Sequence, residues 1–492
     1  MAIVGAGAAA IALLAALSAQ LAGSRRRVSV CVVDTVRLPG TGGVFQEDLQ
    51  SILLNTQAGE ISLVVGEPLH FSRWLAQRNA SSVTAEQGTY APRAEFGRYL
   101  HHVYTDIRDT RDGLDVAHVA DRVDRVRHDG DSWLLRLRHG ATLRARLVVV
   151  AIGPGTPADH YGLAGHAHYV HQPFPLLRNL AAVPPRSRVL VVGSQLSAVD
   201  AVIGLSESGH TGPVTLASRR GLLPLVKAGS SVRPQDADLR FFQDYHRRHG
   251  ELPLRVVARC VRKRLGEQGT CLHEYLRMPA PRNAVEFFGN NVEAARRDDP
   301  SARVVEPSMV EALSMLSAED MALFMRIGYP VLMYKHTAIP LVNAERILRR
   351  IRAGKLALRG GLRAVVPAAE RFAADFGSGA RERFDVVVNA TGAARSICGP
   401  SARAPFTGLC RDALVKETAT GGARVTAEGQ LIPAVGEPSG GLYILGHASI
   451  GTHPFINSLS MISLLAGRMA RSVLRNLADV RSTGFTEEVA GR

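Results

Sequence analysis

The order of apolar and polar positions at the start of the chain predicts a strand, a helix and a second strand. Ile3 and Val4 form a short apolar pair, and residues 9–19 are nearly all alanine, leucine and isoleucine. Val28–Val33 is a further apolar run that ends at Asp34. Because buried parallel strands are continuous apolar runs, this order predicts the first βαβ unit of a parallel α/β sheet.

A signal peptide or a membrane anchor is the competing interpretation of the same stretch. Its length is close to the roughly 20 residues that span a membrane, and three arginines follow at 25–27. However, a secretory signal carries its positive charge before the apolar run, and residues 1–22 contain no basic side chain. Ser18 and Gln20 also make the run weakly apolar. We therefore expect a nucleotide-binding fold and no membrane association.

The segment from Gly5 to Ala10 fits the dinucleotide-binding pattern G-x-G-x-x-A. Gly5 and Gly7 permit a tight turn and a close approach of the backbone to a pyrophosphate, and the small Ala10 lets the helix pack closely on the strand. The N-terminus of that helix then faces the phosphates. Asp34, which ends the second strand, suits a ribose hydroxyl. The opening segment therefore predicts a dinucleotide site.

A second, incomplete copy of this pattern begins at Val189–Val192. Gly193 and Ser194 follow the strand, but Gln195 occupies the place of the second glycine. A side chain there crowds a diphosphate, so we expect this copy to bind its nucleotide somewhat differently. A helical pattern follows over residues 196–205.

The next predicted strand, Val214–Ala217, ends in Ser218, Arg219 and Arg220. An NAD site places an acid at this position to bind the ribose hydroxyls, whereas guanidinium groups suit the 2′-phosphate of NADPH. The sequence therefore predicts that the second site binds NADPH.

Two strand-rich segments, residues 119–155 and 356–392, resemble each other. Each contains turn signals and ends in an apolar run, followed by Ala-Ile-Gly at 151–153 and by Ala-Thr-Gly at 390–392. Such endings mark where the chain passes between the dinucleotide domains of two-nucleotide flavoproteins. Residues 228–350 differ, because helical stretches there are broken by prolines at 279, 281 and 300. The helical stretches that we expect are 238–249 and Ala318–Ile327.

Composition adds limits to this picture. The chain has 492 residues and a formal net charge of +15, which comes from 54 arginines and only five lysines. This bias suits a GC-rich genome, and because the arginines are scattered we expect no nucleic-acid binding. The five cysteines form no C-x-x-C and no metal-ligand spacing, so we expect no metal, reduced thiols in a cytoplasm, and none of the redox-active cysteine pairs of flavoprotein disulfide reductases. They are Cys31, Cys260, Cys271, Cys398 and Cys410.

Together these motifs resemble the bacterial FAD/NAD(P)-binding proteins related to class B flavin monooxygenases, which include the amino-acid N-hydroxylases. The resemblance implies FAD in the first domain and NADPH in the second. It covers nearly the whole chain except the helical insertion, through residues 3–10, 53–62, 90–100, 189–200, 209–224, 389–392 and 441–457.

We therefore predict an α/β fold with two dinucleotide-binding (Rossmann-like) domains and a helical insertion that shapes the substrate region. The expected order is a first part of the FAD-binding domain, the NADPH-binding domain, the insertion, and a second part of the FAD-binding domain. Their expected bounds are residues 1–160, 161–230, 231–350 and 351–492.

The resemblance also implies which residues lie near the flavin. Asn55, Thr56 and Gln57 would lie beside the isoalloxazine ring, while Tyr90 and Arg93 would lie on a loop that closes over it.

The last block of the chain resembles the flavin-binding end of the family. Gly446 and His447 end a strand where FAD proteins have Gly-Asp, so His447 replaces an acid that bonds the ribityl chain. Residues 450–457, including the cofactor contact Phe455, lead into a helix that runs to about residue 474, with Pro454 suited to its first turn. The N-terminus of that helix would stabilise negative charge on the reduced flavin.

Four residues are candidates for the chemistry itself: Asn55, Lys335, His453 and Asn457. Lys335 either meets an anionic substrate or belongs to a solvated helix start. His453 either caps the C-terminal helix or belongs to the active site.

The activity implied by the resemblance is that of a monooxygenase. NADPH would reduce FAD, oxygen would add to the reduced flavin, and a dry pocket would protect the resulting flavin hydroperoxide until the substrate takes one oxygen atom. We expect N-hydroxylation of a small amine or amino acid in a biosynthetic pathway, by a cytoplasmic protein that could be a homo-oligomer. The alternatives are an FAD-dependent NAD(P)H oxidoreductase without oxygen transfer and a non-catalytic FAD-binding protein.

Overall fold

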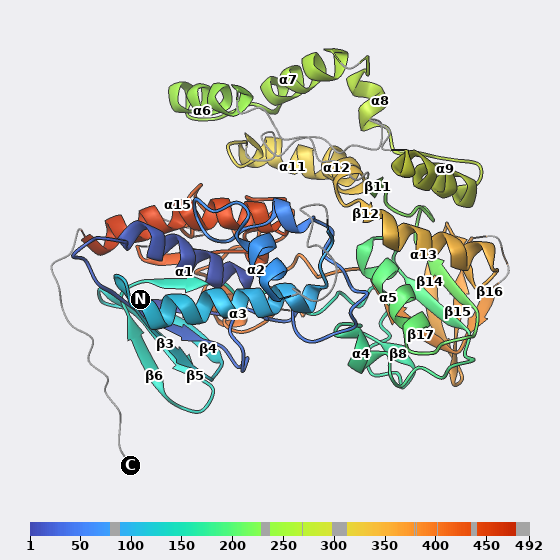
Figure 1. Cartoon of the computed structure of the whole chain (residues 1–492), viewed down its shortest axis with the longest axis horizontal. Helices are drawn as coiled ribbons and strands as arrows, with labels where there is room; N and C mark the ends of the chain where they lie inside the picture. The colour runs from blue at the N-terminus through green and yellow to red at the C-terminus, as the bar shows by residue number, and fades with distance from the viewer. Residues whose placement is uncertain are drawn as a thin grey trace.

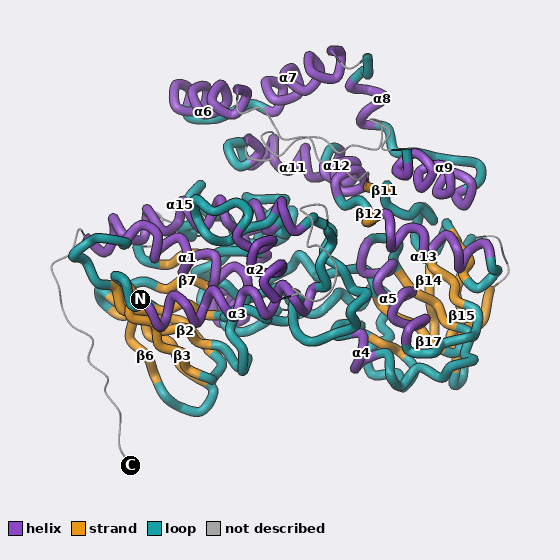
Figure 2. Tube along the Cα trace, in the orientation of Figure 1, coloured by secondary structure: helices purple, strands orange, loops and turns teal. Residues whose placement is uncertain are grey.

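Two five-stranded parallel sheets form the body of the molecule, and they lie side by side (Figures 1 and 2). This confirms the predicted α/β class with two Rossmann-like cores. The computed structural model describes residues 1–78, 89–227, 237–267, 269–297, 312–377, 379, 381–400, 402–433 and 440–478.

The first sheet joins strands from both ends of the chain. Its order is β18-β7-β1-β2-β3, and all its pairings are parallel. An antiparallel meander of three strands, β4-β5-β6, covers one face. The strands are β1 (Ala2–Val4), β2 (Val28–Val33), β3 (Leu114–Val119), β4 (Val123–Asp129), β5 (Ser132–Leu137), β6 (Thr142–Ala145), β7 (Val148–Val150) and β18 (Leu442–Ile444).

Alternate residues of the apolar strands belong to opposite cores. Ile3 packs with the helices on one face of the sheet, whereas Ala2 and Val4 pack with Trp133 of the meander on the other. The helices on the first face are α1 (Ala8–Leu21), α2 (His70–Arg78), α3 (Arg93–Thr110) and α15 (Leu459–Ala478), with the short η1 (Ala58–Glu60) before α2.

Helix α1 settles the interpretation of the opening apolar stretch. It has 14 residues, of which 8–17 are all buried, because it lies against α15 and α3 as well as the sheet. An all-round apolar helix is therefore what this position requires. Among the helices that the structure describes, none is both long and apolar enough to cross a membrane.

The second sheet repeats this design. Its order is β13-β10-β9-β17-β8, again parallel throughout, with the meander β14-β15-β16 on one face. Helices α5, α9 and α13 pack on the other face. The elements are β8 (Tyr169–Val170), α4 (Leu176–Asn179), β9 (Val189–Val192), α5 (Leu196–Glu207), β10 (Val214–Ala217), α9 (Ala284–Arg296), α13 (Leu341–Arg352), β13 (Leu356–Arg359), β14 (Ala364–Ala368), β15 (Arg371–Asp375), β16 (Arg381–Phe384) and β17 (Val386–Asn389).

This topology corrects the predicted boundary between residues 350 and 351. Strands β13 and β17 pair within the second sheet, so the chain returns to the first domain only after Asn389. Helices α9 and α13 likewise belong to the second domain, although they lie in the predicted insertion. Strand pairing joins segments that are far apart in sequence. The apolar pattern of a segment predicts that it forms a strand, but it does not predict which strand it pairs with.

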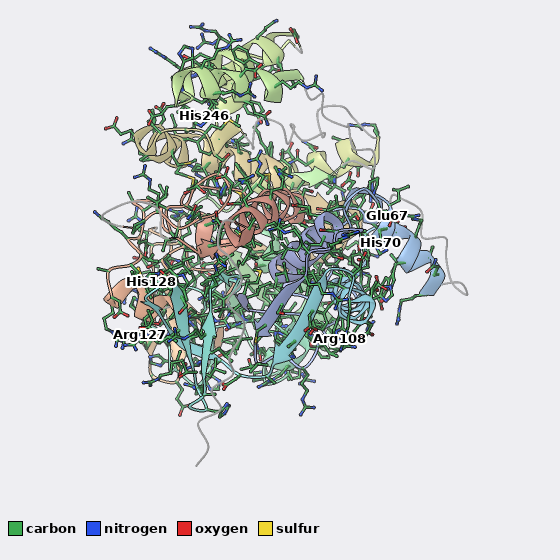
Figure 3. All side chains as sticks on the ribbon, turned by 90° about the vertical axis from the view of Figure 1, so that its left-hand side faces the viewer. Glu67, His70, Arg108, Arg127, His128 and His246 are labelled. Carbon is green, nitrogen blue, oxygen red and sulfur yellow. A yellow bond between two sulfur atoms is a disulfide. The ribbon has the colours of Figure 1, made fainter. Side chains whose placement is uncertain are left out.

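The insertion leaves the second domain at β11 (Val226–Lys227) and returns at β12 (Ile339–Pro340), which pair in parallel. Its other helices form a separate layer above α15 (Figure 1). In Figure 3 the labelled His246 of α6 lies in this layer, above Arg127 and His128 of β4. The helices are α6 (Ala237–His249), α7 (Leu254–Glu267), α8 (Leu272–Leu276), α11 (Ala318–Ile327) and α12 (Tyr329–His336); the predicted break at Pro300 lies outside the described residues.

A buried ion pair joins the two domains. Arg93, the first residue of α3, donates to Asp200 of α5 at 2.6 Å, and the two side chains are only 17% and 5% exposed. Burial raises the pKa of Asp200, and the adjacent Arg93 guanidinium opposes that rise. The Arg93 side chain also donates to the Leu53 carbonyl. Both charges are removed from water, so each is tolerated in the interior only while the other neutralises it.

We predict that Arg93→Met and Asp200→Asn each destabilise the protein strongly, by about 3–5 kcal/mol, since either change leaves one buried charge unpaired. The double variant should cost no more than either single variant. Urea unfolding followed by circular dichroism measures this. Asp109→Asn, which removes an exposed ion pair of the same helix with Arg108, should cost less than about 1 kcal/mol. Additive costs for the buried pair would contradict the interpretation.

Candidate active site

The turn after β1 has the geometry of a phosphate site. Gly5 has a φ of +105°, and a Cβ there would lie 2.6 Å from the Ala151 carbonyl oxygen, so this glycine serves the fold. At Gly7, by contrast, a Cβ would meet only the Cα of Gly42, at 4.0 Å. Gly7 is therefore a glycine whose space the protein leaves open, next to the N-terminal amides of α1, where an anion binds. Ala10 is fully buried, as predicted for close packing of the helix.

Asp34 lies at the same edge of the sheet. Its carboxylate accepts hydrogen bonds from the Ala6 amide at 2.7 Å and the Val36 amide at 3.1 Å, which fixes its orientation. It lines a cavity of about 380 Å³ at the carboxyl ends of β1 and β2. This position and size suit the adenosine part of a dinucleotide. The cavity's other lining residues include Gly5, Asp121, Arg122, Ile152, Ala402, Arg403, Ala404 and Thr407.

The residues predicted beside the flavin ring lie between the two domains. Asn55 and Thr56 are half-buried and Gln57 is buried in the segment that leads into η1. Burial raises the pKa of Tyr90 to about 12, so its hydroxyl stays protonated. Arg93 is engaged by Asp200 in the ion pair between the domains. The flavin contacts predicted for these residues remain predictions.

The C-terminal block is anchored through its histidine. Gly446 has a φ of +91°, and the His447 ring lies 3.0 Å from the Asn457 side-chain oxygen and 2.9 Å from the Ala394 carbonyl. His447 and Asn457 are thus held together near the start of α15. The helix begins at Leu459, so the expectation that Pro454 lies in its first turn is wrong.

His453 is the most deeply buried of the catalytic candidates. It is 3% exposed, and burial lowers its pKa to about 4, so the ring is neutral near pH 7. Its Nε2 has no hydrogen-bond partner among the described residues. The adjacent Phe455 packs on Tyr329 of α12, with ring centroids 5.3 Å apart, which brings the helical layer against this segment.

Lys335 lies in the last turn of α12, so a solvated helix start is the wrong description. Its ammonium group lies over the Tyr275 ring, 4.4 Å from the centroid, and burial lowers the pKa of Lys335. No described acid forms an ion pair with it. Lys335 is therefore a desolvated cation that an anion could neutralise.

The second site repeats the first with different chemistry. Gly193 has a φ of +125°, and a Cβ there would lie 2.4 Å from the Ala390 carbonyl oxygen. Ser194 is buried, and Gln195 is exposed at the N-cap of α5 without capping the helix. The side chain present at 195 thus stands where Gly7 leaves open space in the first site.

Three polar residues end β10 at this site. Ser218 accepts a hydrogen bond from the Gly221 amide at 2.9 Å and shapes the turn. Arg219 and Arg220 are exposed, and neither has an ion-pair partner among the residues that the structure describes. Two uncompensated guanidinium groups at this strand end can meet a phosphate.

The structure also contains features that the sequence interpretation missed. Residues 402–407 form a wall of the first cavity, although no motif marks them. Cys398 and Cys410 form a disulfide, which corrects the expectation that all cysteines are reduced. Their separation of 12 residues matches no known pairing motif, so only the folded chain reveals the pair.

Comparison with known proteins bears on the first domain. Residues 2–155 match the family model described as FAD-NAD(P)-binding. These residues therefore belong to an FAD-NAD(P)-binding domain. No curated protein sequence matches it.

Solved structures resemble the whole chain at low sequence identity. They show that it shares the fold of the flavin-dependent amine hydroxylases. An ornithine hydroxylase from Pseudomonas aeruginosa is 17% identical with a TM-score of 0.58, covering 97% of this chain and 98% of that one. An L-lysine 6-monooxygenase from Pseudomonas syringae is 16% identical with a TM-score of 0.58, covering 97% and 99%. An ornithine N-hydroxylase from Kutzneria sp. 744, solved with reduced FAD, NADP⁺ and L-ornithine, is 16% identical with a TM-score of 0.56, covering 97% and 99%.

We predict that Gly7→Val yields a folded protein without flavin. The added side chain fills the space that the fold leaves open beside the α1 amides, while the protein itself tolerates it. The flavin-to-protein ratio from absorbance measures the effect. Gly467→Val is the matched control, because a Cβ on that helical glycine meets nothing within 4 Å. Full flavin content in the Gly7 variant would refute this assignment.

We also predict that Arg219→Ala/Arg220→Ala raises KM for NADPH at least about tenfold more than KM for NADH, since each charge-assisted contact contributes about 1.5–3 kcal/mol. Steady-state kinetics with both nucleotides measure this. Arg178→Ala/Arg186→Ala removes two other exposed arginines of the same domain and should change neither the KM for NADPH nor the KM for NADH. Equal losses for NADPH and NADH would mean that Arg219 and Arg220 serve the fold.

Proposed function

We propose that this protein is an FAD-dependent, NADPH-consuming monooxygenase that N-hydroxylates a small amine or amino acid. The observation that carries the proposal is that one chain combines two different nucleotide sites with a helical layer. The first site has the open cradle at Gly7, and the second has the exposed Arg219 and Arg220, which form no ion pair with the described residues. Bound FAD, once reduced by NADPH, would supply the chemistry that activates oxygen and passes one oxygen atom to the substrate.

The chain's own residues would bind the substrate and exclude water. Phe324 and Tyr329 of the helical layer pack around Phe455, two residues after the buried His453, whereas Asn457 at the end of the same segment is exposed. A water-poor pocket of this kind favours oxygen transfer over peroxide release. With its low pKa, His453 would accept or donate a hydrogen bond as a neutral ring rather than act as a cation.

Lys335 supports an acidic group on the substrate. It is half-buried in the helical layer without an ion-pair partner among the described residues, and a carboxylate would compensate its charge. We keep Asn55 as a proposed contact on the flavin side. The roles of these residues are proposals of the same kind.

The alternative is an oxidoreductase that transfers no oxygen. A flavin-linked disulfide reductase would hold its cysteine pair at the flavin ring, but the described disulfide joins the ends of a segment whose residues 402–404 and 407 line the adenosine cavity. This placement favours the monooxygenase.

We predict that ornithine, lysine or a related diamine gives a hydroxylated product that contains one oxygen atom from O₂ for each NADPH consumed. Mass spectrometry after reaction under ¹⁸O₂ detects the label, and a peroxide assay measures uncoupled turnover. The true substrate should lower peroxide release relative to the same reaction without amine. Stoichiometric peroxide with every amine tested would favour the oxidoreductase.

A further inference from the structure

The disulfide occupies a position that bears on cofactor binding. It joins Cys398, which is exposed, to Cys410 in α14 (Phe406–Arg411). Between the two cysteines lie Ala402, Arg403, Ala404 and Thr407, which line the adenosine cavity opposite Gly5 and Asp34. The bond therefore closes the ends of a segment that forms one wall of the FAD site.

The C-terminal end of this segment is held independently of the sulfur atoms. Phe406 and Leu409 are 2% and 0% exposed in the core beneath the meander. Asp412, just after α14, receives hydrogen bonds from Arg125 of β4 at 2.9–3.1 Å. Helix α14 would thus stay in place if the disulfide opened.

The N-terminal end is held through one acid and one buried side chain. The Glu417 carboxylate accepts hydrogen bonds from the Ser396 hydroxyl at 2.8 Å and from the amides of Ile397 at 3.1 Å and Cys398 at 3.0 Å, and Ile397 is 6% exposed. Beyond this point, the described residues are all partly or fully exposed up to Ala404. Arg403 has no ion-pair partner among the described residues. The disulfide is therefore a covalent link across the partly exposed residues 402–404, which form the wall itself.

We propose that Cys398–Cys410 is a thiol–disulfide modification site whose oxidised form retains FAD and whose reduced form releases it. A closed loop has fewer conformations than an open one, so the oxidised wall remains in the shape that the adenosine requires. The inference rests on flavin binding at this cavity and is independent of the amine substrate.

A low-molecular-weight thiol is the reactant class that would operate the site. Its thiolate attacks the sulfur of the more exposed Cys398, the S–S bond breaks, and the Cys410 sulfur leaves as a thiolate that takes up a proton. A second thiol then attacks the mixed disulfide and frees Cys398. Two cysteine thiols and one small-molecule disulfide result, so two electrons and two protons enter the protein.

The test compares FAD release from the FAD-loaded protein before and after treatment with dithiothreitol. Flavin fluorescence after dilution should show that FAD leaves the reduced protein about tenfold faster than the oxidised protein. A thiol assay should count two more thiols after reduction. Reoxidation should restore the slow rate.

Two variants separate the disulfide from other cysteines. Cys398→Ser/Cys410→Ser should release FAD at the reduced rate with or without dithiothreitol. Cys260→Ser/Cys271→Ser removes two cysteines outside the disulfide and should keep the full response. If the first variant does not fold, the comparison of the oxidised and reduced natural chain still decides.

Equal FAD release from both redox states would overturn the inference, as would five titratable thiols in protein treated with oxidant. Flavin-loaded protein with redox-dependent release but no amine hydroxylation would count against the proposed function alone. Protein that holds no flavin in either state would contradict both.

Discussion

Both nucleotide sites depend on one close approach of backbone to backbone. The first glycine of each turn lies against the end of the neighbouring parallel strand, where a Cβ would come within 2.6 Å of Ala151 O at Gly5 and 2.4 Å of Ala390 O at Gly193. No side chain fits in that space, and the positive φ of both residues is one that glycine adopts without cost. The approach turns the chain sharply from strand to helix. As a consequence, the first amides of α1 and α5 point out of the carboxyl edge of each sheet, where a phosphate can reach them.

Around that shared turn, the two domains have similar folds and differ in only a few residues at their nucleotide sites. Each orders its strands in the same way, with a meander inserted before the strand that carries the Ala151 or Ala390 carbonyl. The difference lies in the residues beyond the turn. Gly7 leaves space beside α1, while Gln195 presents a side chain, and Asp34 ends one second strand where arginines end the other. The same scaffold therefore offers a carboxylate to a ribose in one domain and guanidinium groups to a phosphate in the other.

The sequence predicted the strands that a local apolar pattern determines. Three strands, β2, β9 and β10, have the predicted bounds Val28–Val33, Val189–Val192 and Val214–Ala217. Continuous apolar runs between turn residues have few other structures available. It failed where distant segments meet. β13 and β17 were assigned to the wrong domain because the residues of a strand do not by themselves determine which strand it pairs with. The Cys398–Cys410 bond was missed for the same reason.

The predicted flavin-ring segment depends on both domains for its position. Residues 48–60 leave the first domain, and Asp48 accepts hydrogen bonds from the amides that begin α4 in the second. Glu60, at the end of η1, pairs with Lys227 of β11 at 2.8 Å. Between these two points the buried pair of Arg93 and Asp200 crosses the same boundary. Since a desolvated ion pair is strongly destabilised when one partner withdraws, the second domain cannot move away without disturbing the segment that carries Asn55–Gln57. The second domain thus helps to hold in place the residues expected to face the flavin.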